Sequence, residues 1–312
     1  MVERVFVTGV GSISPVGLSI DETWSNIKKG VSGVDTISSF DPEGYETTFA
    51  AEATNFEPEA YIDRKQARRM DRFVQLAAAA SLEAFENSGI TINSGNADRM
   101  SVMVASGIGG IITLSEQIGV LNGRGPSRVS PFLVPMMLPD MASGQVSMLL
   151  GAKGANYCTV SACASGADSI GMAFEAIRRG DVDAAVTGGA EAAICPVGVA
   201  GFNACQALSK RNDDPKAASR PFDANRDGFV LGEGAGVLVL ESQTSMESRG
   251  AEPIAEMIGY GSTADAYHIT QPGPEGEGGA RAMKMAIGKA AVSPESIDYI
   301  NAHGTSTPLN DK

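Results

Sequence analysis

Residues 157–168 read Tyr-Cys-Thr-Val-Ser-Ala-Cys-Ala-Ser-Gly-Ala-Asp, and the rest of the chain is interpreted outward from this stretch. Its first four residues are typical of a short buried strand, and a helix is expected from Ala164 to about Arg179. Cys163 falls at the junction, where small neighbours allow a sharp turn and leave the sulfur accessible. A helix N-terminus favours the thiolate, as at a nucleophile elbow. We expect Cys163 to be a nucleophile, and the alternative is a buried, inert cysteine.

Composition excludes several classes of function. The 312 residues can form one large or two medium domains, and the net charge of −13 argues against non-specific nucleic-acid binding. Four cysteines and two histidines without a Cys-x-x-Cys pair argue against a zinc site and indicate reduced thiols. The N-terminus lacks a signal-peptide pattern, and no run of 18 apolar residues occurs. We expect a cytoplasmic protein that binds no metal, nucleic acid or membrane.

Apolar segments that predict strands alternate with segments that predict helices along the whole chain. Strands are expected at 4–8, 101–105, 183–187, 229–241, 254–261 and 297–301. Helices are expected to begin after Ser19 and to cover about 61–88, 112–122, 140–150, 197–204 and 278–291. The alternation predicts an α/β fold with mostly parallel sheets. Gly9 and Gly11 form a Gly-x-Gly after the first strand, but the third glycine of a dinucleotide site is missing.

The helix expected at 61–88 combines a buried side with a basic face. Met70, Phe73, Val74, Ala77 and Ala84 recur at helical spacing. The basic residues of its first turns are Arg64, Lys65, Arg68, Arg69 and Arg72. A solvated helix face is one interpretation. Because this local charge opposes the charge of the whole chain, a docking patch for an acidic partner is the other.

A strand followed by a small-residue turn with a reactive side chain occurs a second time near the end of the chain. This second copy covers 300–307 and carries His303, in an accessible setting that suits a catalytic base. His268 lies in a loop without such a setting, so we expect a structural role for it. No helix or closing strand follows His303 before Lys312. We therefore expect a C-terminally truncated chain.

A cysteine and a histidine together allow either peptide hydrolysis or acyl transfer. The residues around Cys163 do not match the papain signature, which includes a Trp beside the cysteine. Thiolates exchange readily with thioesters, so an acyl chain carried on another thiol is a natural substrate. A carbanion can then attack the acyl-cysteine, provided that a donor such as an imidazole N–H stabilises the enolate oxygen.

Four motifs in order resemble those of the condensing enzymes of fatty-acid synthesis, in particular the β-ketoacyl-acyl-carrier-protein synthase II branch. They are Ser161-Ala162-Cys163-Ala164-Ser165-Gly166, Arg220-Pro221-Phe222-Asp223 with Arg226-Asp227-Gly228-Phe229, Gly232-Glu233-Gly234-Ala235-Gly236, and Asn301-Ala302-His303-Gly304-Thr305-Ser306-Thr307-Pro308. The resemblance implies a thiolase-like five-layer αβαβα sandwich of two similar halves, usually as a homodimer. The first half would occupy 1–250, and 251–312 would begin a second, incomplete half.

The resemblance also implies a decarboxylating Claisen condensation. Cys163 would take an acyl chain from acyl carrier protein, and malonyl carrier protein would lose CO2 to give an enolate. The enolate would attack the acyl-cysteine and yield a 3-oxoacyl product two carbons longer, with His303 stabilising the enolate. No resident cofactor is implied, because the phosphopantetheine arm arrives on the carrier protein.

By the same resemblance, further residues have binding roles. Thr305 and Thr307, with Thr270 as a further candidate, would hydrogen-bond the phosphopantetheine arm. Ile108 and Phe202 would line the pocket for the acyl chain. The basic residues Lys65, Arg68 and Arg69 would meet the acidic carrier protein.

The sequence also departs from the pattern of these enzymes. The Lys, the second His and the Gly-rich loop that follow the first His there do not occur within the 312 residues. We therefore expect that the chain alone does not complete the condensation, and that it acylates Cys163 only if its incomplete sheet folds. A non-catalytic partner subunit of the chain-length-factor type is the alternative, although such subunits lack the nucleophile. A cysteine hydrolase is the third reading of the Cys-His pair.

Overall fold

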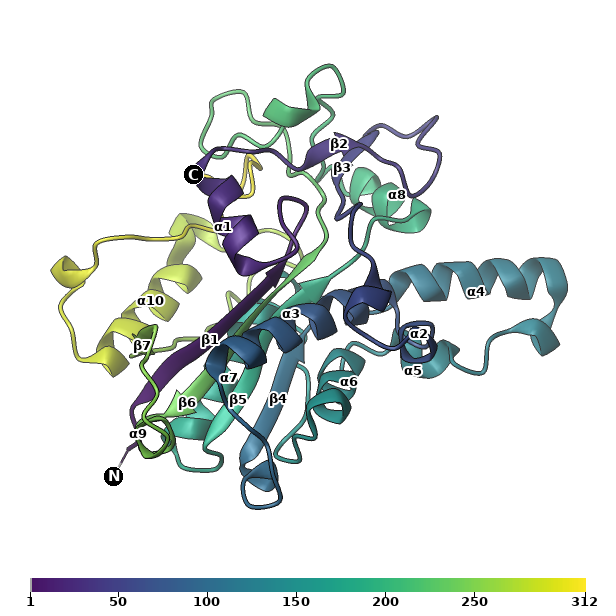
Figure 1. Ribbon diagram of the computed structural model, residues 1–312. Coiled ribbons are helices and arrows are strands. Elements are labelled where there is room, and N and C mark those ends of the chain that lie inside the picture. Colours follow the sequence, from purple (N-terminus) through teal and green to yellow (C-terminus); the bar gives the residue numbers. More distant parts are fainter. Residues whose placement is uncertain (1) are drawn as a thin grey trace.

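Five strands form the central sheet of the protein, which is described for residues 2–312 by a computed structural model (Figure 1). In sheet order they are β4 (Met100–Ala105), β5 (Ala184–Glu191), β6 (Gly234–Ser242), β1 (Val5–Ile13) and β7 (Ala255–Met257). Only β4 and β5 pair in parallel, and the other neighbours are antiparallel. The prediction of a mostly parallel sheet is therefore wrong. The chain after β5 stays at one end of the sheet, so that Gly234 at the start of β6 pairs with Glu191.

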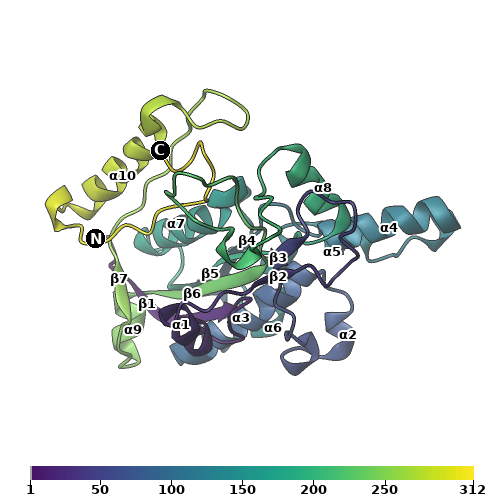
Figure 2. The same cartoon turned by 90° about the horizontal axis from the view of Figure 1, so that it is seen from above.

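Helices cover both faces of this sheet (Figure 2). On one face lie α3 (Arg72–Ser88) and α6 (Met141–Leu150), and on the other lie α7 (Ser165–Arg178) and α10 (Glu277–Ala290). Side chains of a strand alternate between the faces. Val102 and Val104 of β4 join the core beneath α3 and α6, whereas Met103 joins the core beneath α7. The predicted α/β class is confirmed, and residues 2–312 supply three layers of the expected sandwich.

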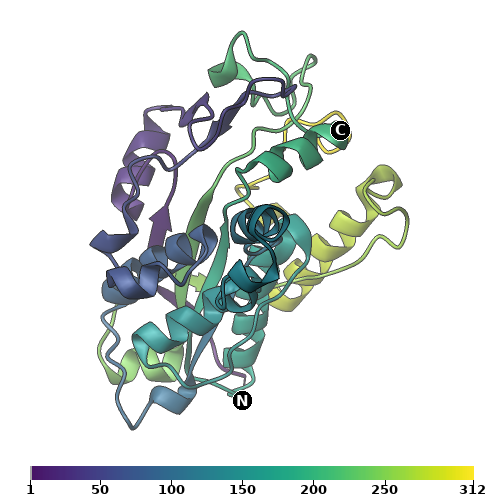
Figure 3. The same ribbon diagram turned by 90° about the vertical axis from the view of Figure 1, so that its right-hand side faces the viewer.

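Several of the remaining elements gather at the end of the sheet opposite to α9 (Gln243–Ser248), as Figure 1 and Figure 3 show. A small antiparallel pair, β2 (Val34–Thr36) and β3 (Phe49–Ala51), lies near α8 (Pro196–Ala204). An arm is formed by α4 (Ile111–Arg124) and α5 (Leu133–Met137): α4 projects away from the body, and α5 lies back at the base of the arm (Figure 1). The other short helices are α1 (Ile20–Lys28), α2 (Arg64–Ala67) and α9 (Gln243–Ser248). Within residues 2–312, no helix combines the length and apolarity needed to cross a bilayer.

The helix expected at 61–88 is interrupted by two acidic caps. The Asp63 carboxylate accepts the N–H of Lys65 (2.9 Å) at the start of α2. Buried Asp71 begins α3 and accepts the N–H of Phe73 (3.4 Å) and that of Thr113 in α4 (2.8 Å). Side-chain capping competes with helix continuation, so the chain breaks into α2 and α3. The predicted buried side is confirmed, because each of its members is buried: Met70, Phe73, Val74, Ala77 and Ala84.

Two expected strands are absent from residues 2–312. Residues 157–160 follow an isolated bridge between Asn156 and Val102 of β4 but do not join the sheet, because the Ser143 hydroxyl of α6 bonds the N–H and the carbonyl of Val104. The Ser143 hydroxyl donates to the Tyr157 carbonyl (3.0 Å), and the Asn156 side chain donates to the Ser143 carbonyl (2.9 Å). Residues 297–301 are exposed along their length and have no partner strand in the described part of the chain.

The Gly-x-Gly of β1 serves close packing. A Cβ on Gly9 would lie 2.1 Å from the Ala84 carbonyl oxygen, and one on Gly11 would lie 2.1 Å from that of Ala80. Both distances are far below van der Waals contact, so only glycine lets α3 lie this close to β1. This packing accounts for the glycine pair without a nucleotide.

Candidate active site

Cys163 lies on a single 3-10 turn, Ala162–Ala164, that leads directly into α7. The backbone of Ala162 is left-handed (φ 52°), which is unfavourable for a residue with a Cβ. Ser165 holds the turn in this shape: its hydroxyl accepts the N–H of Ser161 (2.9 Å) and donates to the Ala162 carbonyl (2.7 Å). The result is the sharp, exposed turn expected from the small residues, although no strand precedes it.

The carboxylate of Asp168 connects this turn to the segment after β7. The Ser161 hydroxyl donates to Asp168 (2.5 Å), and the hydroxyl of Tyr260 donates to the other carboxylate oxygen (2.6 Å). Burial would raise the pKa of Asp168, but the hydrogen bonds from Ser161, Tyr260 and Ser262 outweigh it and lower that pKa. The charged carboxylate of Asp168 therefore links the turn of Cys163 to Tyr260.

His303 lies beside the Cys163 thiol, although the two are 140 residues apart (303 − 163). The interaction with His303 is the main cause that lowers the pKa of Cys163, against burial and the charge of Glu191, which raise it. The interaction with Cys163 raises the pKa of His303, against burial, which lowers it. The two shifts favour a thiolate beside an imidazolium, the pair that activates a cysteine nucleophile.

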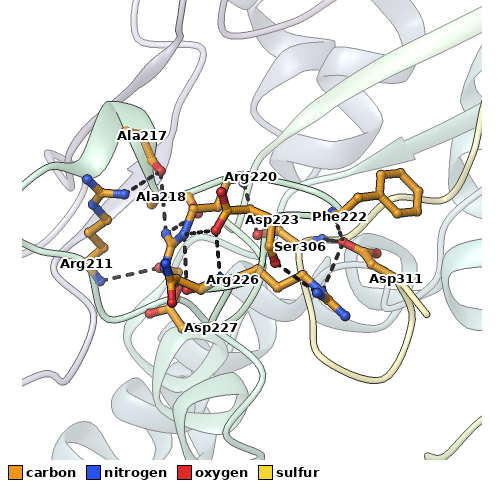
Figure 4. Close-up of polar contacts among 12 residues, drawn as sticks. Arg211, Ala217, Ala218, Arg220, Phe222, Asp223, Arg226, Asp227, Ser306 and Asp311 are labelled. Carbon is orange, nitrogen blue, oxygen red and sulfur yellow. Dashed lines mark hydrogen bonds and ion pairs between the residues drawn. The ribbon is translucent and has the colours of Figure 1, made fainter.

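A buried carboxylate fixes the segment that carries His303 (Figure 4). Asp311 accepts the backbone N–H groups of Phe222 and Ser306, each at 3.0 Å, and lies 3.7 Å from the guanidinium of Arg226. Arg226 also donates to the Thr307 carbonyl (3.0 Å). Burial would raise the pKa of Asp311, but its hydrogen bonds and Arg226 lower it. We call this set of contacts the Asp311 clip.

Ser306 also connects the segment that carries His303 to residues 220–228. Its buried hydroxyl accepts the N–H of Arg220 (3.0 Å), and its carbonyl accepts that of Gly228 (3.0 Å). The side chain of Arg220 pairs with Asp227 (3.0 Å) within the charged loop. The sequence-based prediction missed the roles of Ser306 and Asp311. The one sequence feature that indicates these roles is the high density of charged residues at 209–227, because such residues need ion-pair and hydrogen-bond partners.

The threonines expected to bind the substrate arm do not all lie together. Thr305 and Thr307 lie side by side just after His303, with their hydroxyls 2.9 Å apart. Thr270 lies in an exposed loop, where its N–H donates to Nδ1 of His268 (3.2 Å). The same ring nitrogen accepts the N–H of Gln271 (3.2 Å), so His268 stabilises its own loop.

The two residues expected to line the acyl pocket occupy different surroundings. Phe202 packs edge-on against Phe229, with ring centroids 5.3 Å apart, beside a buried apolar cluster. Ile108 is 39% exposed. It follows Gly107, and a Cβ added to that glycine would lie 3.1 Å from the Ala162 carbonyl oxygen. Ile108 therefore borders the turn that carries the nucleophile.

Lys65, Arg68 and Arg69 are exposed around a hollow on α2 and its C-terminus. The guanidinium of Arg69 lies 4.6 Å from the ring centre of Phe132, which closes one side of the hollow. Arg72 does not belong to this basic face as predicted, because it turns inward and forms a bidentate ion pair with buried Glu233 (2.6 and 2.7 Å).

Two family models match the chain: Beta-ketoacyl synthase, N-terminal domain, over residues 2–245, and Beta-ketoacyl synthase, C-terminal domain, over 254–312. A 3-oxoacyl-[acyl-carrier-protein] synthase 2 of Staphylococcus aureus (strain COL) is 54% identical over 309 residues, which are 99% of this chain and 74% of that protein. The match therefore extends through both segments that meet at the site.

Solved structures agree with the sequence matches. A beta-ketoacyl synthase from Burkholderia phymatum STM815 has a TM-score of 0.91 at 37% identity, over 99% of this chain and 76% of that one. A type II PKS ketosynthase, solved with its acyl-carrier protein and bound to a hexaketide, has a TM-score of 0.85 at 32% identity, over 100% and 76%. The thiolase-like ketosynthase architecture expected from the sequence is thereby confirmed.

Replacement of His303 by Ala is predicted to move the pH profile of Cys163 alkylation to higher pH. His303 lowers the pKa of the thiol, so its loss raises that pKa and leaves less thiolate at neutral pH. Iodoacetamide labelling of Cys163, followed by peptide mass spectrometry across pH, measures the profile. His268→Ala is the matched control and should leave it unchanged; equal profiles for the wild type and His303→Ala would contradict the assignment.

Proposed function

The chain belongs to the beta-ketoacyl synthase family, and we propose that its Cys163–His303 pair serves the condensing step of fatty-acid elongation. The observation that carries this proposal is the exposed thiol on a sharp turn, beside an imidazole that lowers its pKa. Such a thiol attacks thioesters at neutral pH.

In the first half-reaction, the sulfur of Cys163 attacks the thioester carbonyl of an acyl carrier protein. A new carbon–sulfur bond forms to Cys163, and the bond to the phosphopantetheine sulfur breaks. His303 takes the thiol proton and passes it to the departing thiolate. The left-handed turn at Ala162 presents the sulfur beyond the surrounding backbone, where a carrier-bound thioester can reach it.

In the second half-reaction, the carbon–carbon bond to the carboxylate of malonyl carrier protein breaks and CO2 leaves. The electron pair becomes an enolate that attacks the acyl-Cys163 carbonyl, and the sulfur leaves as thiolate. Neutral His303 donates its N–H to the enolate oxygen. The paired hydroxyls of Thr305 and Thr307 hydrogen-bond the phosphopantetheine arm, which arrives on the carrier protein, so the reaction needs no resident cofactor.

The alternatives are less well supported. A chain-length-factor-type subunit lacks the nucleophile, whereas Cys163 is present here in contact with His303. A cysteine hydrolase would need a different set of relatives from those that match this chain.

The four cysteines are all free, which supports a location in the reducing cytoplasm.

The hollow formed by Lys65, Arg68 and Arg69 is the proposed docking site for the acidic carrier protein. It is basic on a chain of net charge −13, and Phe132 adds an apolar contact at its edge. A basic patch of this kind steers an acidic partner toward the surface and fixes its orientation.

The arm of α4 and α5 is the proposed contact with a second copy of the chain. Its exposed apolar side chains exceed what a solvated helix needs: Leu114, Ile118, Leu121, Val134 and Leu138. The arm projects beyond the body of the protein (Figure 1). A twofold dimer would bury this surface against the same surface of its partner.

Incubation of the protein with a long-chain acyl carrier protein is predicted to add one acyl group, as measured by intact mass. Cys163→Ala removes the acceptor sulfur, so no adduct should form. Cys205→Ala is the matched control, since Cys205 is the other exposed thiol and should not accept the chain. An adduct that persists in Cys163→Ala would refute the assignment.

Replacement of Lys65, Arg68 and Arg69 together by Ala is predicted to raise the carrier-protein concentration for half-maximal acyl transfer by about tenfold at low salt, since each exposed charge contributes roughly 0.2–1 kcal/mol. Added salt should shrink the difference. A triple change of Lys29, Lys153 and Lys216, which are exposed elsewhere, is the control. Equal transfer curves for the two triple variants would exclude the hollow as the docking site.

Ile118→Glu is predicted to shift the protein from dimer to monomer in sedimentation velocity, because a buried unpaired charge opposes association. Ile27→Glu on α1 is the control, since Ile27 is similarly exposed on another surface. A wild-type protein that sediments as a monomer would refute the proposed contact.

A further inference from the structure

Glu191, at the end of β5, is a half-buried carboxylate that the reaction above does not use. Its Oε2 accepts the backbone N–H of Gly107 (2.9 Å) and of Ile108 (3.1 Å), and its Oε1 accepts the hydroxyl of Ser106 (3.0 Å). The Ser106 oxygen in turn accepts the N–H of Gly109 (2.9 Å). One carboxylate therefore fixes the whole segment after β4, directly or through Ser106.

This segment lies against the turn that carries the nucleophile. A Cβ on Gly107 would lie 3.0 Å from Oε2 of Glu191 and 3.1 Å from the carbonyl oxygen of Ala162. The backbone of Gly107 therefore occupies a narrow space between the carboxylate and the residue before Cys163. The exposed side chain of Ile108 emerges next to that space.

We propose that Glu191 is a positioning residue of the reaction centre, which holds Gly107 and Ile108 against the turn of Cys163 and so determines which acyl chains the thiol accepts. The proposal rests on the proposed role of Cys163 as the acyl acceptor. An acyl group on that sulfur extends past the neighbouring backbone, so the position of this segment limits the shapes that fit.

The charge of Glu191 gives the proposal a second, independent readout. Glu191 raises the pKa of Cys163, whereas His303 lowers it. Burial raises the pKa of Cys158, and the charges of Asp140 and Glu191 add to this effect. Burial raises the pKa of Glu191, partly offset by its hydrogen bonds. Removal of the charge at constant shape should therefore change the reactivity of Cys163 without displacing the segment.

Three variants separate these effects. Glu191→Gln keeps an acceptor but removes the charge, and Glu191→Ala removes both. Ser106→Ala removes the hydrogen bonds of Ser106 to Glu191 and Gly109 but keeps those of Glu191 to Gly107 and Ile108. Glu83→Gln is the matched control, because the Glu83 carboxylate also accepts two backbone N–H groups, those of Ser12 (2.8 Å) and Ile20 (2.7 Å), on the other face of the sheet. The measurements are the pH profile of iodoacetamide labelling at Cys163 and the rates of acyl transfer from short- and long-chain acyl carrier proteins.

Glu191→Gln is expected to move the labelling profile to lower pH. Glu191→Ala is expected to change the ratio of long- to short-chain transfer by about tenfold, the scale of a hydrogen bond to a charged group. Ser106→Ala should change this ratio less and leave the profile in place. If both Glu191 variants match Glu83→Gln in profile and ratio, the inference is overturned. A wild-type protein that accepts no acyl chain would instead overturn the proposed function.

Discussion

The buried carboxylate of Asp311 is the contact on which the reaction centre depends. It accepts N–H groups from Phe222 and Ser306 and lies beside the guanidinium of Arg226. A buried carboxylate is tolerated when it is hydrogen-bonded and paired in this way, and loss of one partner leaves the others unsatisfied. Because the strand expected just before His303 does not form, regular structure does not hold the histidine in place. The Asp311 clip, eight residues further along, does so instead.

The sheet supplies the other half of the site. The parallel strands β4 and β5 end together, which places Glu191 beside the segment after β4. The start of α7 packs onto the same strand ends, where a Cβ on Gly189 would lie only 3.1 Å from the Cα of Gly166. Sites in α/β proteins commonly lie at the carboxyl ends of parallel strands, where the loops diverge. The antiparallel direction of β6 and β7 therefore leaves the site where it is, because that end is formed by β4, β5 and α7.

The sequence predicts the periodic parts of this structure well. The helices α4, α6, α7 and α10 lie close to their expected positions, since their apolar residues recur at helical spacing. The sharp turn at Cys163 follows from its small neighbours. Periodicity fails where side chains compete for the backbone: Asp63 and Asp71 divide one expected helix, and Ser143 draws 157–160 away from the sheet.

Long-range polar partners are beyond such reasoning. Nothing in the spacing of Arg72 indicates that it leaves the basic face for Glu233, more than 150 residues away. Ser306 and Asp311 are missed for the same reason, because single polar residues form no pattern until the fold brings their partners together. The motifs around Cys163 and His303 did indicate a shared site, since their chemistry is specific even when their separation is not.

The opposed effects of His303 and Glu191 on the pKa of Cys163 suit a sulfur that must act first as a nucleophile and then as a leaving group. Attack on a thioester needs a thiolate, and departure from the acyl-cysteine needs a stable one. A lower thiol pKa favours both the thiolate population and its departure, but it weakens the intrinsic nucleophilicity of the sulfur. His303 lowers the pKa of the thiol overall, while burial and, to a smaller degree, the charge of Glu191 oppose this effect. Since Glu191 also fixes the adjacent backbone, one carboxylate couples the reactivity of the sulfur to the shape of the space beside it.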